Sequence, residues 1–115
     1  MKVVTIGVAS LDEVKSRVAG AFKGEVQGSY ITFVSPELLW STLNEKRWAI
    51  IKVMTGQGPM SIREAARRVG RDVKAVHGDV QKLLLNGVLK RAEDGRVVFP
   101  YDAIHVDFMM PASAA

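Results

Sequence analysis

Side chains that could bind phosphate are concentrated between positions 61 and 96 of this sequence. Arginine binds phosphate through paired N–H donors, lysine binds it as a compact charge, and serine adds a hydroxyl donor. The first set precedes an expected tight turn and comprises Ser61, Arg63, Arg67 and Arg68. The second set follows that turn and comprises Arg71, Lys74, Ala75, His77, Gly78, Gln81 and Lys82. The third set, Lys90, Arg91 and Arg96, flanks a second turn, and the three sets together predict contacts with a polyanion.

Helical periodicity directs the first two sets outward. At about 100° per residue, an apolar stripe runs along each of two predicted helices. The stripes comprise Ile62, Ala65, Ala66 and Val69 on the shorter helix, and Val73, Val76, Val80, Leu83 and Leu84 on the longer one. The face opposite the longer stripe centres on Gly78, with Arg71, Lys74, Ala75 and Lys82 beside it. Both outward faces are basic, whereas an ordinary solvated helix pair should mix the signs of charge, so the pattern favours a nucleic-acid interface.

Several of these residues allow alternative interpretations. His77 lies at the border of the apolar stripe, so we favour a half-buried histidine that packs or hydrogen-bonds over one that reads bases. Gly78 costs a helix about 1 kcal/mol relative to alanine, and it either lets the backbone approach a base edge or phosphate or simply lacks a contact. Glu93 and Asp94 would repel DNA, so an ordinary turn with a Glu93–Arg96 pair remains an alternative to a DNA-binding hairpin.

Composition and charge restrict the class of protein. The chain has 115 residues, 48% of them hydrophobic and 24% charged, which fits one globular domain with or without an extension. It has no cysteine, which excludes a disulfide framework, a cysteine-ligated metal site and a thiol nucleophile. The net charge of +4 conceals a basic segment, because residues 44–96 hold twelve basic and six acidic side chains, a net of +6. Residues 1–43 are neutral, and residues 97–115 have a net charge of −2.

The elements that must position the basic sets have the order of a winged helix-turn-helix over residues 35–110. Ser35-Pro36-Glu37 and Asn44 each open a helix, Ser61 caps the shorter helix, and Asp72 caps the longer one, which ends at Asn86-Gly87. Strands over 88–92 and 96–99 join at Asp94-Gly95, a strong hairpin signal. Alternating apolar residues predict a last strand over 101–110. In such an arrangement one helix enters the major groove while the hairpin contacts flanking phosphates.

Residues 1–34 predict a β-α-β extension, so the whole chain is expected to be of the α+β class. Strands are expected over 2–8 and 29–34, and a helix begins at Leu11 after a capping box formed by Ser10 and Glu13 and ends at Gly24. So small an extension cannot cover both faces of its sheet. We therefore expect it to pack on the rest of the chain or to mediate a homodimer, and we expect residues 111–115 to be a disordered tail.

The remaining signals argue against other functions. No apolar run approaches the roughly 20 residues needed to span a membrane, and the β-branched start suits a strand better than a signal peptide, so we expect a cytoplasmic protein. His77 and His105 lack the spaced ligands of a metal site, and Gly56-x-Gly58 lacks the following Lys-Ser/Thr of a phosphate-binding loop. We therefore predict that the chain is not an enzyme and uses no cofactor or metal.

The motifs resemble a known prokaryotic family. They are Phe33-Val-Ser-Pro-Glu, Glu45-Lys-Arg-Trp, Gly58-Pro-Met-Ser-Ile-Arg-Glu-Ala, Gly70-Arg-Asp-Val, Val76-His and Phe99-Pro-Tyr-Asp. This combination, over about residues 33–108, is similar to predicted winged-helix transcriptional regulators, broadly MarR-like, often regarded as antitoxins of two-gene toxin–antitoxin modules. The resemblance implies dimeric DNA binding, autoregulation of an operon and neutralisation of a small toxin protein. Members often carry a basic residue where this chain has Gly78.

The leading hypothesis is thus a sequence-specific, dimeric repressor that binds double-stranded operator DNA and acts as an antitoxin. We expect that changing Arg71 and Lys74 together to alanine abolishes operator binding and leaves the melting temperature nearly unchanged. The alternative hypothesis is a winged-helix module that binds a toxin partner without reading DNA. RNA binding is a weaker third hypothesis, because the chain lacks an aromatic stacking platform.

Overall fold

The computed structural model describes residues 1–9, 12, 29–110 and 112. The helix expected over residues 11–24 lies outside the described residues, as does most of the expected 111–115 tail. The chain divides into two compact units. We call Met1–Lys2 with Thr42–Ala103 the helical unit, and Val3–Ser41 with Ile104–Ala115 the sheet unit. The division falls near residues 41 and 103, whereas the sequence suggested a boundary after residue 34.

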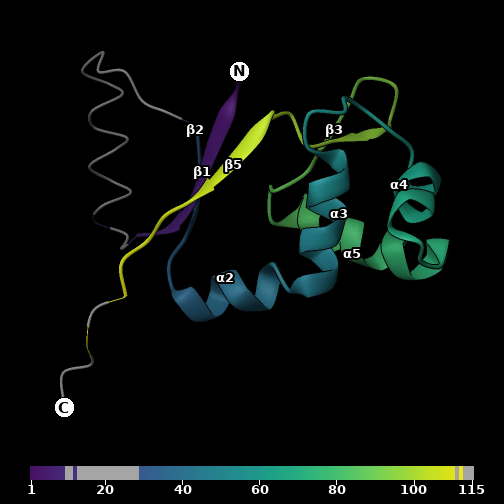
Figure 1. The fold of residues 1–115 in the computed structure, drawn as a ribbon. Helices are drawn as coiled ribbons and strands as arrows, with labels where there is room; N and C mark the ends of the chain where they lie inside the picture. The colour runs from purple at the N-terminus through teal and green to yellow at the C-terminus, as the bar shows by residue number, and fades with distance from the viewer. Residues whose placement is uncertain (10–11, 13–28, 111, 113–115) are drawn as a thin grey trace. The chain divides into compact units, whose positions relative to one another are not determined.

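The helical unit contains α3 (Glu45–Met54), α4 (Ile62–Val69) and α5 (Val73–Leu85) (Figure 1). Each helix has a polar N-cap, which accepts a bond from one of the otherwise unpaired N–H groups of the first turn. Asn44 Oδ1 accepts from the N–H of Arg47 at 3.0 Å, Ser61 Oγ from Glu64 at 3.0 Å, and Asp72 Oδ2 from Lys74 at 3.0 Å. The three predicted caps are confirmed.

A tight turn separates α4 from α5. Gly70 has a φ of 70°, a left-handed conformation that favours glycine because a Cβ would clash there. The N–H of Arg71 then bonds the carbonyl of Ala66 at 3.1 Å, which satisfies the end of α4. The turn brings the apolar faces of the helices together. Their buried side chains are Ile50, Ile51 and Met54 of α3, Ala65 and Ala66 of α4, and Val76, Val80 and Leu83 of α5.

The predicted hairpin is present with shorter strands than the sequence suggested. Strands β3 (Lys90–Arg91) and β4 (Val97–Val98) pair antiparallel, and Gly95 in the turn has a φ of 86°. Val88 and Leu89 stay outside β3 because their N–H groups bond the Leu83 carbonyl at the end of α5, at 2.9 and 3.2 Å. On the other side of β4, Met60 and Val97 exchange two backbone bonds of 2.8 and 2.9 Å.

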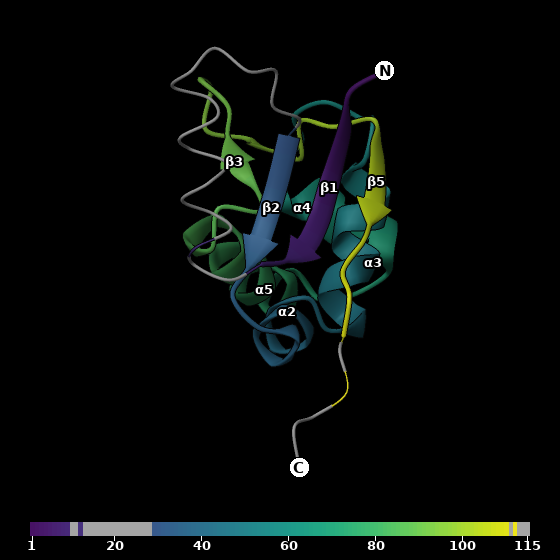
Figure 2. The same cartoon turned by 90° about the vertical axis from the view of Figure 1, so that its left-hand side faces the viewer.

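The sheet unit is built on three strands in the order β2-β1-β5 (Figure 2). Strand β1 (Val3–Val8) pairs parallel with β2 (Ser29–Phe33), from Val4 opposite Ser29 to Val8 opposite Phe33. This pairing confirms the two expected strands of the extension. Helix α2 (Pro36–Thr42) follows β2, and the predicted Ser35 cap is confirmed, since its Oγ accepts from the N–H of Leu38 at 3.1 Å.

Strand β5 (Ala103–Val106) lies on the other side of β1 and is shorter than the strand expected over 101–110. Its run beside β1 begins where Ala103 donates to the Lys2 carbonyl and continues to Asp107, which donates to Ile6 at 3.0 Å. Gly7 makes the close approach at this end feasible, because a Cβ there would collide with the carbonyl oxygen of Asp107.

The described residues therefore confirm an α+β protein with small sheets. The more specific assignment as a winged helix stays a prediction. None of the helices in the described part of the chain combines the length and the apolar character that a membrane span requires.

Candidate nucleic-acid interface

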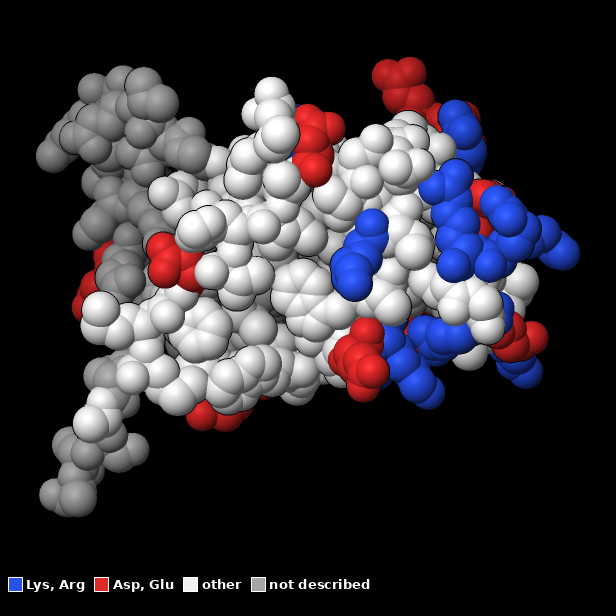
Figure 3. All heavy atoms as spheres, in the orientation of Figure 1, with Lys and Arg blue, Asp and Glu red and all other residues white. Residues whose placement is uncertain are grey.

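All three basic sets belong to the helical unit, on α4, on α5 and around the β3–β4 hairpin. Figure 3 shows lysine and arginine side chains gathered over α4 and the hairpin, with carboxylates among them. The carboxylates matter because an arginine bound to one within the chain has less of its charge available for phosphate. The partners of the side chains therefore decide how much of each set's charge is available.

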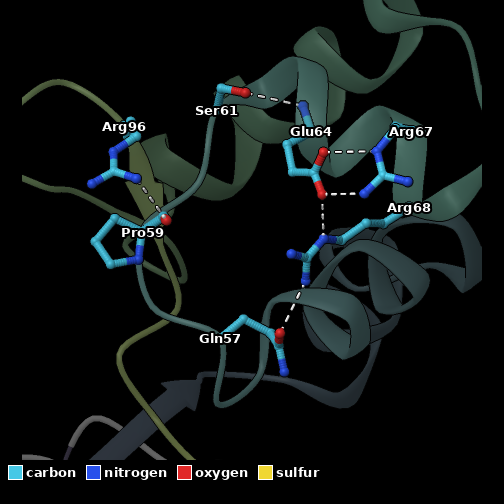
Figure 4. A network of polar contacts seen from close by, with 7 residues as sticks. All are labelled: Gln57, Pro59, Ser61, Glu64, Arg67, Arg68 and Arg96. Atoms are coloured by element: carbon cyan, nitrogen blue, oxygen red, sulfur yellow. Dashed lines mark hydrogen bonds and ion pairs between the residues drawn. The ribbon is translucent and has the colours of Figure 1, made fainter.

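On α4, Arg67 and Arg68 both bind Glu64 (Figure 4). Arg67 Nε donates to Glu64 Oε1 at 2.8 Å, Arg68 Nε donates to Oε2 at 2.7 Å, and Arg68 also donates to the Gln57 side chain at 3.0 Å. The hydrogen bonds from Arg67 and then Arg68 lower the pKa of Glu64 from 4.5 to about 2. The carboxylate is thus ionised at neutral pH and orients two arginines at the surface.

The other two members of this set differ in role. Ser61 Oγ accepts the capping bond that begins α4, so its lone pair serves the helix while its hydroxyl hydrogen can still be donated. Arg63 is exposed and makes no side-chain hydrogen bond or ion pair with any described residue. Arg63 is therefore the most available cation of α4.

Arg71 has a structural partner that its position on the sequence did not reveal. Its Nη2 donates to Asp79 Oδ2 at 2.9 Å, and Arg47 Nε donates to the other carboxylate oxygen at 3.0 Å. The side chains of Arg47, Asp79 and Arg71 are only 11%, 16% and 23% exposed. Burial raises the pKa of Asp79, but the hydrogen bonds from Arg71 and Arg47 outweigh burial and hold this pKa below its ordinary value. Asp79 thereby links α3, the turn and α5.

The outward face of α5 carries the remaining members of the second set. Lys74, Ala75, His77, Gly78, Gln81 and Lys82 are all exposed. Within the described ranges, the ammonium groups of Lys74 and Lys82 form no hydrogen bond or ion pair. They are free to contact a ligand.

The expectation of a half-buried His77 is wrong. The side chain is exposed, and its Nε2 lies 3.4 Å from the amide nitrogen of Gln81, one turn along the helix. The helical wheel placed it at the edge of the apolar stripe, and a small rotation of α5 in the packed unit suffices to turn such an edge position to solvent. Gly78 beside it has open space, with no atom within 4 Å of where a Cβ would stand.

The hairpin set is partly neutralised. Arg96 binds Asp94, at 2.6 Å between Nε and Oδ2, so the Glu93–Arg96 pair that the sequence offered as an alternative is wrong. The backbone N–H of Arg96 and then its side chain lower the pKa of Asp94. Arg96 also donates to the Pro59 carbonyl at 3.3 Å (Figure 4), and Arg91 donates to the Gly95 carbonyl at 2.9 Å. Lys90 is exposed and makes no such bond with the residues that the structure describes.

The model of the family HVO_A0114 matches residues 42–106, which are more than half of the chain. The chain belongs to the HVO_A0114 family. No curated protein and no solved structure matches it. The matched segment of this HVO_A0114 chain includes α3, α4, α5 and the hairpin, and hence every residue of the three basic sets.

Sequence reasoning missed Arg47 and Asp79 in this HVO_A0114 protein. One signal was available, because Asp79 is the only acidic residue inside the longer helix. An acid on a helix otherwise basic at its surface indicates a partner elsewhere in the fold. Among the described residues, no group of three or more histidine or carboxylate side chains could hold a metal ion.

Proposed function

We propose that this chain is a transcriptional regulator that binds double-stranded DNA through a winged helix-turn-helix, with α5 in the major groove. The observation that carries the proposal is the exposed face of α5, where Lys74 and Lys82 have no partner in the described part of the chain. An α-helix fits the major groove of B-DNA, and side chains on its outward face reach base edges and phosphates.

The surroundings of α5 support this function. Arg63 on α4 and Lys90 on β3 are also exposed and unpaired among the described residues, so cations are available on the helix before the turn and on the hairpin. Phosphate contacts from these elements would fix the position of α5 without reading sequence. Gln81 and His77 offer hydrogen-bonding groups on the same face of α5 for base edges.

The contacts also suggest how strongly binding should depend on salt. Four arginines of the basic sets already have carboxylate partners within the chain: Arg67, Arg68, Arg71 and Arg96. Within the three basic sets, four cations make no hydrogen bond or ion pair with described residues: Arg63, Lys74, Lys82 and Lys90. Each neutralised phosphate contributes about −0.9 to the slope of log binding constant against log salt concentration. Four contacts would give a slope of roughly −3.6 per chain.

The biological role that we propose follows from the family resemblance. The chain acts as an autoregulating repressor, binds its operator as a homodimer and neutralises a small toxin protein encoded beside it. Pairing of two copies would present two α5 helices to two half-sites, which is how helix-turn-helix proteins usually gain sequence specificity.

The test is a fluorescence anisotropy titration of the full chain with labelled DNA from upstream of its own gene. The variant Lys74→Ala/Lys82→Ala should bind more weakly than the wild type, and its salt slope should be about 1.8 shallower. The matched control Lys46→Ala/Lys52→Ala removes two exposed lysines from α3 and should bind as the wild type does. Equal loss of binding in both variants, or wild-type binding by the first, would rule out α5 as the reading helix.

A second candidate function is binding of a protein partner without DNA recognition. Leu85 at the end of α5 is 87% exposed, and it borders a hollow lined also by Leu84, Leu89 and Lys90. An apolar surface beside a cation fits an acidic, apolar segment of a partner. On this candidate the wild type retains the protein encoded by the neighbouring gene and gives no salt-dependent shift of promoter DNA, and Leu85→Lys should abolish binding of that protein. Wild-type binding of the protein by the variant would exclude this surface.

A further inference from the structure

The sheet unit ends in strand β5, whose outer edge pairs with none of the strands that the structure describes. In Figure 2, β5 is the outermost strand beside β1. The N–H groups of Ala103 and Asp107 bond β1, so the odd-numbered residues of this segment direct their backbone toward the sheet. Because backbone direction alternates along a strand, Ile104, Val106 and Phe108 direct their N–H and carbonyl groups outward. No described strand pairs with that edge.

This edge has few of the features that normally prevent pairing with another strand. Natural edges are kept very short or carry charged side chains, proline or a bulge. Strand β5 is short, at four residues, and Asp107 follows it, but residues 103–108 contain neither proline nor lysine. Val106 is 49% exposed although it is β-branched and apolar. An exposed apolar strand edge is a template for another strand.

We propose that β5 pairs antiparallel with β5 of a second copy of this chain, with the two copies of Val106 opposite each other on a two-fold axis. The outward groups of Val106 would then bond each other. Ile104 would lie opposite the second copy's Phe108, so the pairing would extend two residues beyond the end of β5 at Val106. The two three-stranded sheets would form one continuous sheet. Such an interface is isologous, since the same residues contribute from both copies.

Charge complementarity favours this register when His105 is protonated, because only the imidazolium form is a cation. His105 and Asp107 are exposed on the same face of the strand, with 3.7 Å between His105 Nε2 and Asp107 Oδ2. With Val106 on the axis, each His105 faces the second copy's Asp107, and the pair occurs twice. Moving the axis to residue 105 would place histidine opposite histidine, and moving it to residue 107 would place carboxylate opposite carboxylate. Like charges directly opposite are destabilising.

This inference specifies the surface for the homodimer of the proposed function, but it does not depend on DNA binding. A chain that dimerises through β5 and fails to bind DNA would contradict only the proposed function. A chain that binds DNA but does not pair through β5 would contradict only this inference.

Disulfide trapping tests the register directly, since the wild-type chain has no cysteine. Opposite residues of a hydrogen-bonded antiparallel pair have Cα atoms about 5.5 Å apart, within the range for a disulfide. Under mild oxidation of the full chain, Val106→Cys should form a covalent dimer. His105→Cys and Asp107→Cys should each stay monomeric on a denaturing gel, because each cysteine lies diagonal to the same residue of the second copy, at roughly 7–8 Å. An equimolar mixture of the two variants should cross-link, because residue 105 lies directly opposite residue 107 of the second copy. Cross-linking of His105→Cys alone as fast as Val106→Cys, or no cross-linking of any variant, would overturn the proposal.

A charge exchange gives a second test without covalent trapping. His105→Asp places carboxylates opposite each other and should weaken dimerisation about tenfold, measured as the dissociation constant by light scattering over a concentration series. Asp107→His should also weaken the dimer, and the double variant His105→Asp/Asp107→His should restore it because the opposite pairs return. A monomeric wild type over the whole series, or a double variant as weak as the single variants, would contradict the pairing.

Discussion

Arg71 and Lys74 lie three residues apart, yet the structure predicts opposite consequences for their removal. Arg71→Ala loses a charge-assisted hydrogen bond to Asp79, whose carboxylate keeps Arg47 as its partner. Hydrogen bonds to charged groups contribute about 1.5–3 kcal/mol, and the lower end applies because the Arg71 side chain is 23% exposed. A loss of about 1.5 kcal/mol lowers the melting temperature by roughly 6 °C in a domain of this size.

Lys74→Ala should leave stability within about 0.5 kcal/mol of the wild type, as for surface substitutions in general. Its effect should fall on DNA instead, with the salt slope shallower by about 0.9. The expectation that changing both residues leaves the melting temperature unchanged therefore needs correction, because the Arg71 half of that change removes a contact within the fold.

The assay combines thermal unfolding with DNA titrations at several salt concentrations, at a temperature where all variants are folded. Asp79→Ala serves as a control that is destabilised without losing a cation. It removes the partner of both arginines and should cost about 3 kcal/mol, while the salt slope is not reduced. If Arg71→Ala unfolds at the wild-type temperature and loses 0.9 or more of the slope, Arg71 is a DNA contact and the structural role assigned to it is refuted.

Three further predictions concern single sites. Glu64→Gln should release its two arginine partners and make the salt slope of DNA binding steeper. The fold lowers the pKa of Glu64 from 4.5 to about 2, so its contribution to wild-type stability is complete above pH 4.5 and is lost as the pH falls toward 2. Acid unfolding of the wild type and the variant can check this pH range. Gly78→Ala should raise the melting temperature by roughly 4 °C because glycine costs a helix about 1 kcal/mol; unchanged DNA affinity is expected, and a loss would show that the backbone approaches DNA closely there. Gly7→Ala should cost about 1–3 kcal/mol, since a Cβ would collide with the Asp107 carbonyl, and hydrogen exchange should quicken at the Asp107 amide; wild-type stability would show that the approach is looser.

The local features of the helical unit could be predicted because they depend on residues a few positions apart. Ser61 caps a helix whose third residue donates to it, and Gly70 supplies the left-handed residue that ends that helix. Each feature is decided within about four residues, which is the range over which a sequence pattern carries direct physical information.

The partners of the arginines could not be predicted in the same way. Arg47 and Asp79 are 32 residues apart and meet only because α3 packs beside α5. Such a contact depends on helix packing angle and side-chain rotamer, which no periodicity specifies. The shortened β3 has a similar origin, since the N–H groups of Val88 and Leu89 are used by the end of α5 before they can pair in a strand.

The backbone pairing of Met60 with Val97 has a mechanical consequence for the hairpin. Strand β4 is held on one side by β3 and on the other by the residue that precedes Ser61 and α4. A force on the hairpin tip is therefore transmitted to the first turn of α4 and is not absorbed by a hinge. Insertions at residues 93–95 would lengthen the hairpin tip while its base stays paired to the residue before α4, so a variant with a longer hairpin would extend its reach without reorienting α4.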